Sequence, residues 1–208
     1  MSTRPRRRRK AFTKSDKKQF SIAMQAVKLN EKKVSELKFH DFFRPAIPVS
    51  TAGDIRELTT IAQGDQGNQR DGSDVFCKTL FIRIEMENPD QGNAKGLRVI
   101  IFRWNRPTTP VIANILQSAV NAPYLQPISQ VNSKWINILH DKSYSISAKD
   151  ASGDLILKKL FINVNRKITW QPASINNESG NLYLLAVSNS ALNDPTIGYV
   201  SRVRYLDN

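Results

Sequence analysis

The sequence contains a single cysteine, Cys77, among its 208 residues. One thiol excludes an intrachain disulfide framework and a CxxC-type metal cluster, so the chain does not belong to the small disulfide-bonded or zinc-bound classes. Cys77 lies in a run of alternating apolar residues, where a cysteine most often packs as a small hydrophobic side chain. Nothing in the sequence indicates an oxidising compartment.

Long hydrophobic runs are also missing. No segment approaches the roughly 20 apolar residues of a transmembrane helix, which predicts that the protein has no membrane partner. The N-terminus is strongly charged, but no apolar stretch follows it, so it lacks the pattern of a secretory signal. These absences predict a soluble intracellular protein.

Motifs of catalysis are absent as well. The sequence holds no GxxxxGK[ST], GxGxxG, HExxH or GxSxG pattern. Its two histidines, His40 and His140, each precede an aspartate, Asp41 and Asp141, and such a pair resembles half of a catalytic dyad. His140 shares its strand parity with neighbouring isoleucines, which favours an ordinary packed or edge histidine. The chain is therefore predicted not to be an enzyme.

Positive charge is abundant and unevenly placed. The formal net charge is +13, from 31 Lys and Arg against 18 Asp and Glu. Residues 1–38 hold 13 basic and 3 acidic groups, a balance of +10, whereas residues 39–208 hold the other 18 and 15, a balance of +3. An almost neutral body behind a basic leader predicts a tail that binds a polyanion.

Residues 1–18 are predicted to form a disordered, arginine-rich arm, because they contain too few apolar side chains to offset the entropy of ordering. Guanidinium groups pair with phosphate oxygens, and binding by counterion release needs only many cations on a flexible segment. Alternatives are a solvated charge run and a nuclear-import signal, which can share the same segment. The nine basic residues predicted to bind nucleic acid, against Asp16 alone, are Arg4, Arg6, Arg7, Arg8, Arg9, Lys10, Lys14, Lys17 and Lys18.

Residues 19–40 are predicted to form a short amphipathic helical segment. The apolar side chains of Phe20, Met24, Val27, Val34 and Leu37 fall near helical spacing, with lysines between them. The alternative is a partly ordered linker.

Residues 41–208 carry the pattern of an all-β domain. Alternation with period two runs through "VFCKTLFIRIEME" and "ILKKLFINVNRKITW", which predicts strands with one face in a core. The segments "GLRVIIFRW" and "NLYLLAVSN" are apolar on both parities, as expected of strands with both faces covered. Further strands are predicted in "KWINILHDKSYSIS", "GYVSRVRYLDN" and, more weakly, "IRELTTIAQ".

One short helix is expected between these strands, with Thr109 as its cap and Pro110 at its first position. Seven or eight long strands with irregular links favour a single jelly roll, an eight-stranded antiparallel β-sandwich, over a propeller or an immunoglobulin-type sandwich. Arg202 and Arg204 share the outward parity of the last strand, which suits either added positive potential or a plain solvated face.

Residues 63–74, "QGDQGNQRDGSD", gather acidic and amide side chains around three glycines. Such a stretch suits a polar loop with tight turns. It also offers oxygen ligands for a hard cation such as calcium, although the spacing is not that of an EF-hand. Both interpretations stay open on the residues alone.

From this loop onward the sequence resembles the coat proteins of satellite tobacco necrosis virus and its relatives. The similarity begins in "IAQGDQGNQRDGSDV" and continues in "VIIFRWNRPTTPVIANILQSA" and "YLQPISQVNSKWINILHDKSYSIS". These segments cover roughly residues 58–170 in order and at similar spacing. The arginine-rich N-terminus followed by a helical stretch fits as well.

The resemblance implies one jelly-roll domain of two four-stranded sheets, assembled with copies of itself into a small icosahedral shell of about 60 subunits. It implies a basic arm pointing inward to a single-stranded RNA or DNA genome, and a location in the virion and in the host cytoplasm, with the nucleus added if the arm is an import signal. No cofactor is required, but calcium between subunits is implied at the positions of Asp71, Asp74 and Asp207. This sequence departs from the family in having carboxylates at both loop positions.

Two other classes compete with a capsid protein. A cellular nucleic-acid-binding protein, such as a ribosomal or chromatin factor, usually spreads basic residues over its folded surface, whereas this body is only +3. A viral movement or silencing-suppressor protein would coat nucleic acid without closing a shell.

Overall fold

The computed structural model describes residues 36–148, 155–172 and 177–207, together with Lys18, Gln19, Ser21, Ile22 and Met24. The chain divides into two units, Met1–Glu36 and Leu37–Asn208. In the first unit, Lys18, Gln19, Ser21, Ile22 and Met24 have helical backbone conformation and are exposed, whereas Glu36 is already part of a strand. The other residues of the segment between 19 and 35 lie outside the described residues.

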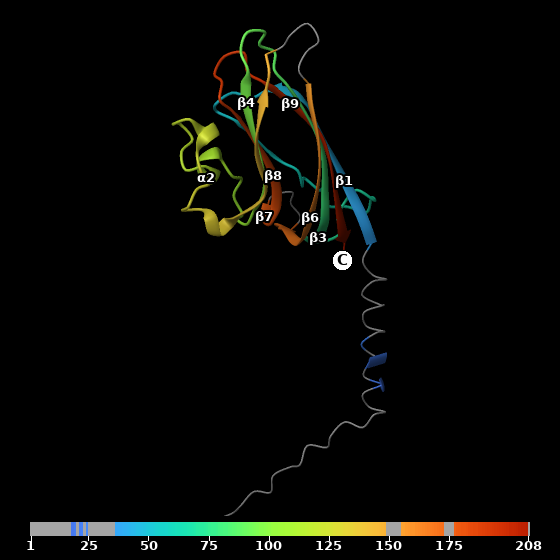
Figure 1. Cartoon of the computed structure of the whole chain (residues 1–208). Helices are drawn as coiled ribbons and strands as arrows, with labels where there is room; N and C mark the ends of the chain where they lie inside the picture. Colours follow the sequence, from blue (N-terminus) through green and yellow to red (C-terminus); the bar gives the residue numbers. More distant parts are fainter. Residues whose placement is uncertain are drawn as a thin grey trace, which may run out of the picture. The chain divides into compact units, whose positions relative to one another are not determined.

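The second unit is a β-sandwich (Figure 1). Its described residues form nine strands in two antiparallel sheets, with orders β1-β9-β3-β6-β7 and β2-β8-β4-β5. The strands are β1 (Glu36–Pro48), β2 (Asp54–Glu57), β3 (Asp74–Glu87), β4 (Lys95–Trp104), β5 (Ile136–Ile146), β6 (Leu155–Trp170), β7 (Asn177–Ser179), β8 (Asn181–Ser188) and β9 (Thr196–Asp207).

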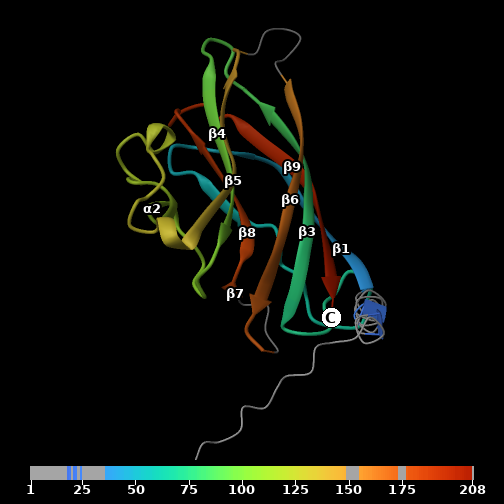
Figure 2. The same cartoon turned by 60° about the horizontal axis from the view of Figure 1, so that its bottom comes forward.

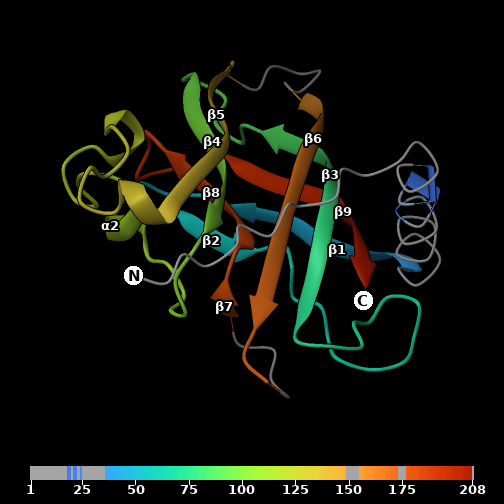
Figure 3. The same ribbon diagram turned by 90° about the horizontal axis from the view of Figure 1, so that it is seen from below.

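The chain crosses repeatedly between the two sheets, and its strands are ordered within them as in a jelly roll. The strands β1, β3, β6 and β9 lie in one sheet, and β2, β4, β5 and β8 lie in the other. Figure 3 shows the sandwich from below, with β4, β5 and β8 of one sheet beside β3, β6 and β9 of the other. The predicted pair of four-stranded sheets is confirmed, and the three-residue β7 extends one of them beyond the prediction.

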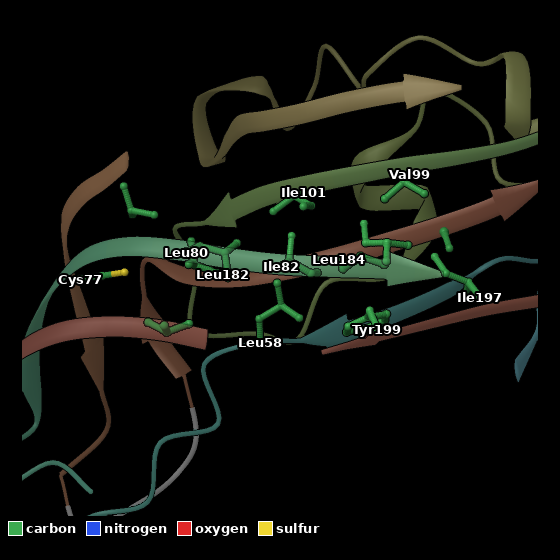
Figure 4. Close-up of a cluster of buried hydrophobic side chains, with 14 of the residues drawn as sticks. Leu58, Cys77, Leu80, Ile82, Val99, Ile101, Leu182, Leu184, Ile197 and Tyr199 are labelled. Carbon is green, nitrogen blue, oxygen red and sulfur yellow. The ribbon is translucent and has the colours of Figure 1, made fainter. Parts of the chain in front are cut away.

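The core lies between the two sheets, where side chains of β3, β4, β8 and β9 meet (Figure 4). Leu80, Ile82 and Ile84 of β3 are almost fully buried there, as the period-two pattern predicts. Cys77 belongs to the same cluster, and burial raises the pKa of its thiol to about 12. A thiol with so high a pKa is inert, which agrees with its predicted packing role.

A second apolar cluster covers the outer face of the β2-β8-β4-β5 sheet. Phe102 and Trp104 of β4 and Tyr183 of β8 pack there against Ile115 and Leu116, which lie in and just after the helix α2 (Ile112–Ile115). The same connection contains two short 3-10 helices, η1 (Pro123–Leu125) and η2 (Ser133–Trp135). Apolar side chains on both parities of β4 and β8 are thereby explained, since both faces of these strands are buried.

The start of α2 differs from the expectation. Its N-cap is Val111, so Thr109 and Pro110 precede the helix. The Val111 backbone N–H donates to Asn114 Oδ1 at 3.0 Å, and the Asn114 N–H donates to the Val111 carbonyl at 2.8 Å. Asn114, the third residue of the helix, thus accepts from the N-cap backbone N–H, as the N3 residue of a capping box does. No helix among the described residues has the length and apolar character needed to cross a bilayer.

The boundary at residue 40 is corrected by β1, which begins at Glu36. Residues 36–40 are therefore strand, although they are included in the predicted helical segment. The pattern misled because it is inverted at this end of β1: Lys38 points inward and is buried, while Leu37 and Phe39 are exposed. The apolar and polar residues still alternate here, but the polar ones face the core, which is the reverse of the usual strand pattern.

Candidate functional site

Eight of the nine basic residues predicted to bind nucleic acid lie outside the described residues. They are Arg4, Arg6, Arg7, Arg8, Arg9, Lys10, Lys14 and Lys17. The ninth, Lys18, is helical and exposed. The arm therefore stays a prediction from composition.

Two of the three predicted calcium ligands meet around a lysine. Lys38 Nζ lies 2.9 Å from Asp71 Oδ1 and 3.0 Å from Asp207 Oδ2, and the Asp71 backbone N–H donates to Asp207 Oδ2 at 2.8 Å. The side chains of Lys38 and Asp207 are 3% and 1% exposed, whereas that of Asp71 is 56% exposed. Hydrogen bonds to the two carboxylates raise the pKa of Lys38, so it carries its charge.

This cluster ties three distant segments together: the start of β1, the loop after residue 58, and the C-terminal end of β9. Figure 2 shows β1 and the end of β9 beside each other. Arg70 fixes the loop from inside. Its guanidinium donates to the carbonyls of Ile61, at 3.2 Å, and of Gly72, and lies 4.7 Å from the ring centre of Trp170. The loop thus presents Asp71 to Lys38 on a rigid support.

Asp74, the third predicted ligand, is not part of this cluster. Its Oδ2 lies 2.7 Å from Lys167 Nζ on the neighbouring strand β6, at an exposed position. Within the described part of the chain no group of three or more acidic, histidine or cysteine side chains could hold a metal ion. The ammonium of Lys38 stands between Asp71 and Asp207, so this arrangement in one subunit does not fit a calcium ion.

A second constellation lies on the outer face of the β1-β9-β3-β6 sheet. The strand register places Phe81 of β3 between Phe161 of β6 and Arg202 of β9. The next row sets Arg83 beside Lys159, and the row on the other side sets Thr79 beside Arg204. We call this set, with Phe39 of β1, the arginine–phenylalanine face; its members are Phe39, Thr79, Phe81, Arg83, Lys159, Phe161, Arg202 and Arg204.

The arginine–phenylalanine face is open and hollowed. A groove of about 450 Å³ runs between Phe81, Phe161 and the arginines of β3 and β9. Phe161 is 64% exposed and Phe39 47% exposed, which is unusual for phenylalanine on a sheet. The guanidinium of Arg202 lies 4.7 Å from the ring centre of Phe39, and that of Arg83 lies 5.4 Å from Phe81.

Charge on this face is mostly unneutralised. Arg202 is paired with Asp41 through two bonds of 2.7 and 2.6 Å, and this pairing lowers the pKa of Asp41. Among the residues that the structure describes, Arg83 and Arg204 make no ion pair with an acid. The face therefore offers cations next to exposed aromatic rings, a combination suited to anionic, planar ligands.

The sequence places the chain in a family. A family model of the satellite tobacco necrosis virus coat protein matches residues 6–208. The chain belongs to this coat protein family. It is therefore a capsid protein with a structural role, located in the virion, and the match spans both the arm and the jelly roll.

Solved structures similar to this coat protein share little sequence with it. One is that of Desmodium yellow mottle tymovirus, at 8% identity and a TM-score of 0.40, covering 83% of this chain and 88% of that one. Another is that of broad bean stain virus, at 10% identity and a TM-score of 0.34, covering 81% and 84%. A search of curated proteins finds no significant match to the sequence.

The histidines of the coat protein do not form catalytic pairs with the aspartates beside them. Adjacent residues of a strand point to opposite faces of the sheet, so His140 and Asp141 diverge. Asp141 binds Arg98 at 2.8 and 2.7 Å, while His140 Nε2 lies 3.3 Å from Tyr144 Oη. Burial lowers the pKa of both His40 and His140, as expected of packed histidines.

Lys38 and the aromatic members of the arginine–phenylalanine face were not predicted from sequence. Lys38 stands 33 and 169 residues from its two partners, so no local pattern connects them. The face could have been suspected from the outward parity of β6, where Phe161 follows Leu155 and Leu157 at alternate positions. The outward direction of Arg202 and Arg204 was predicted and is confirmed by their exposure.

Proposed function

We propose that this coat protein assembles into a closed icosahedral shell of about 60 subunits and packages single-stranded nucleic acid through its basic arm, residues 2–18. The observation that supports this most is the division of charge. Residues 2–18 carry a net charge of +8 (9 − 1), while residues 39–208 carry +3 (18 − 15). Membership of the coat protein family agrees with a basic arm that binds nucleic acid and a nearly neutral body that forms the shell.

The charges have the scale that packaging needs. About 60 copies with about 10 excess positive charges each supply on the order of 600 charges, enough to neutralise a strand of about a kilobase or somewhat more. An almost neutral body lets neighbouring subunits approach without strong mutual repulsion. The phosphate contacts of a flexible arm carry no sequence information, so either an RNA or a DNA genome is compatible with the proposal.

In the host, the proposal places the protein in the cytoplasm, where new subunits are made. The same arginine cluster is suited to act as a nuclear-import signal, which would add the nucleus.

Assembly is tested by imaging and sedimentation of the purified full chain. We expect closed, uniform particles in negative stain and a mass near 1.4 MDa in analytical ultracentrifugation, because about 60 subunits of 23.5 kDa give that value before the genome is counted. A monomer that binds nucleic acid would indicate a non-capsid binding protein. Open filaments on nucleic acid would indicate a coating protein of the movement or silencing-suppressor kind.

The calcium hypothesis is tested by chelation. Because Lys38 already neutralises Asp71 and Asp207, we expect excess chelator to leave the melting temperature of the particles unchanged within about 1 °C. Differential scanning calorimetry with and without chelator measures this. A clear fall in the melting temperature, reversed by added calcium, would show that a cation does bind at or between subunits in spite of Lys38.

A further inference from the structure

The two outer faces of the sandwich differ in a way that calls for an explanation. The β2-β8-β4-β5 sheet is covered by the segment between β4 and β5, which contains α2, η1 and η2. The outer face of the β1-β9-β3-β6 sheet has no such layer among the described residues, although it exposes Phe39, Phe161 and Val200. Exposed apolar side chains gathered on one face mark a binding surface.

Charge decides between the possible occupants. The charged residues that line the groove are Arg83, Arg202, Arg204 and Asp41, a net charge of +2 (3 − 1). A second copy placed on this face through a two-fold axis would bring like charges together, and this disfavours a subunit contact. A polyanion with flat apolar groups satisfies both the cations and the phenylalanine rings.

We propose that the arginine–phenylalanine face binds unpaired stretches of the packaged nucleic acid, with bases stacked on Phe81 and Phe161 and phosphates held by Arg83 and Arg204. This inference rests on the proposed packaging function and adds a second, ordered contact to that of the arm. The groove of about 450 Å³ is within the range of small-ligand pockets, about 300–1,000 Å³, and so has room for a base.

The spacing of these groups suits one strand of nucleic acid. Phe81 and Phe161 are directly opposite each other on β3 and β6, and neighbouring strands lie about 4.8 Å apart, so the two side chains leave the same face of the sheet at adjacent positions. We take this pair as the stacking platform. Arg83 and Arg204 flank that platform two residues away along β3 and on β9. Every base has a flat face, so stacking here discriminates little between sequences.

The arm is tethered by a short length of chain to the sheet that carries this face. Residues 19–35 connect the arm to β1, the edge strand of this sheet, and even if fully extended they span roughly 60 Å. Phosphates gathered by the arm are thereby kept at a high local concentration near the face. In this proposal the flexible arm contributes affinity for phosphates, and the arginine–phenylalanine face holds individual bases in defined positions.

Photochemical crosslinking with mapping of the adducts tests this inference. Full-length protein is mixed with a single-stranded oligonucleotide containing 5-iodouracil, irradiated, digested and analysed by mass spectrometry. We expect adducts on Phe81 and Phe161 in addition to the arm. In the variant Arg83→Gln/Arg204→Gln these sheet adducts should fall about tenfold while the arm adducts persist, and the salt dependence of binding should weaken by about 1.4 in its logarithmic slope, since two phosphate contacts are lost.

Arg106→Gln is the matched control, because Arg106 stands over Trp135 on the other side of the sandwich and should leave the sheet adducts unchanged. Adducts confined to the arm would overturn the inference while leaving packaging intact. If the double variant then also sedimented differently in the absence of nucleic acid, the face would be a contact between copies. No adduct anywhere, together with no closed particle, would overturn the packaging proposal itself.

Discussion

Replacing Lys38 by methionine should lower the free energy of unfolding of the subunit by about 3 kcal/mol, because the change leaves the carboxylate of Asp207 buried without its cation. Methionine keeps much of the lysine's apolar volume, so the effect comes mainly from the lost ammonium. For a domain of this size the melting temperature should fall by about 6–12 °C. Thermal and urea unfolding followed by tryptophan fluorescence measure both quantities.

Lys167→Met is the matched control for this prediction. Lys167 forms an ion pair with Asp74 at a similar distance, 2.7 Å, but the two side chains are 61% and 38% exposed. Exposed pairs contribute at most about 1 kcal/mol, so this variant should change stability little. Adding Asp207→Asn to Lys38→Met should restore a good part of the loss, because it removes the uncompensated charge. Equal losses in the two lysine variants would refute a special role for Lys38.

The pH dependence of the Lys38 effect follows from its pKa. The two carboxylates raise the pKa of Lys38 in the folded chain. A raised pKa of a basic group gives stabilisation that is complete below the unfolded value, about 10.4, and is lost as the pH rises through the folded value. The difference in stability between wild type and Lys38→Met should therefore stay constant between pH 6 and 9.

The position of Lys38 has a mechanical consequence for the fold. An edge strand frays easily from its free end, and β1 is both an edge strand and the continuation of the arm. Lys38 holds the beginning of β1 to the loop and to the end of β9, and Asp41 adds the bidentate pair with Arg202 three residues later. These two contacts therefore hold the end of β1 at which residues 1–35 join the fold.

The strands were predictable where their burial leaves a clear pattern in the sequence, either one buried and one solvent-exposed face or two buried faces. β3 and β6 show period two over more than a dozen residues, and β4 and β8 show the apolar runs of strands covered on both faces. The first residues of β1, 36–40, were not predictable as strand, because the inward position 38 is a lysine. The order in which the strands pair was not predicted, since periodicity does not state which strands are neighbours.

The candidate sites were predictable only as far as local pattern reaches. Within one subunit the structure brings Asp71 and Asp207 together and pairs Asp74 with Lys167 instead. The resemblance to the coat protein family implied these three aspartates only as calcium ligands between subunits. It could not imply the lysine between Asp71 and Asp207, which comes from a third segment. Likewise the parity of β9 predicted that Arg202 points outward, but its neighbour Phe81 follows from the register with β3.

Deleting residues 2–18 should leave the fold intact and reduce the packaged nucleic acid by more than half. The deletion removes a net charge of +8 from a chain whose total is +13, so about 60 subunits lose roughly 480 of their positive charges. The jelly roll begins at Glu36, so its core and the Lys38 cluster are untouched. The ratio of absorbance at 260 and 280 nm and a nuclease-protection assay measure the packaged strand, and calorimetry checks the fold.

Two variants of the arm separate charge from length and order. Changing the nine basic residues to glutamine keeps the length and should reduce packaging as much as the deletion does. Scrambling residues 2–18 keeps composition and should leave packaging unchanged, since counterion release needs cations but no sequence. If the glutamine arm still protected a full-length strand from nuclease, the arm would have no packaging role, and the cations of the sandwich itself would have to hold the genome. If the scrambled arm failed, the arm would be an ordered reader of nucleic acid, which its composition argues against.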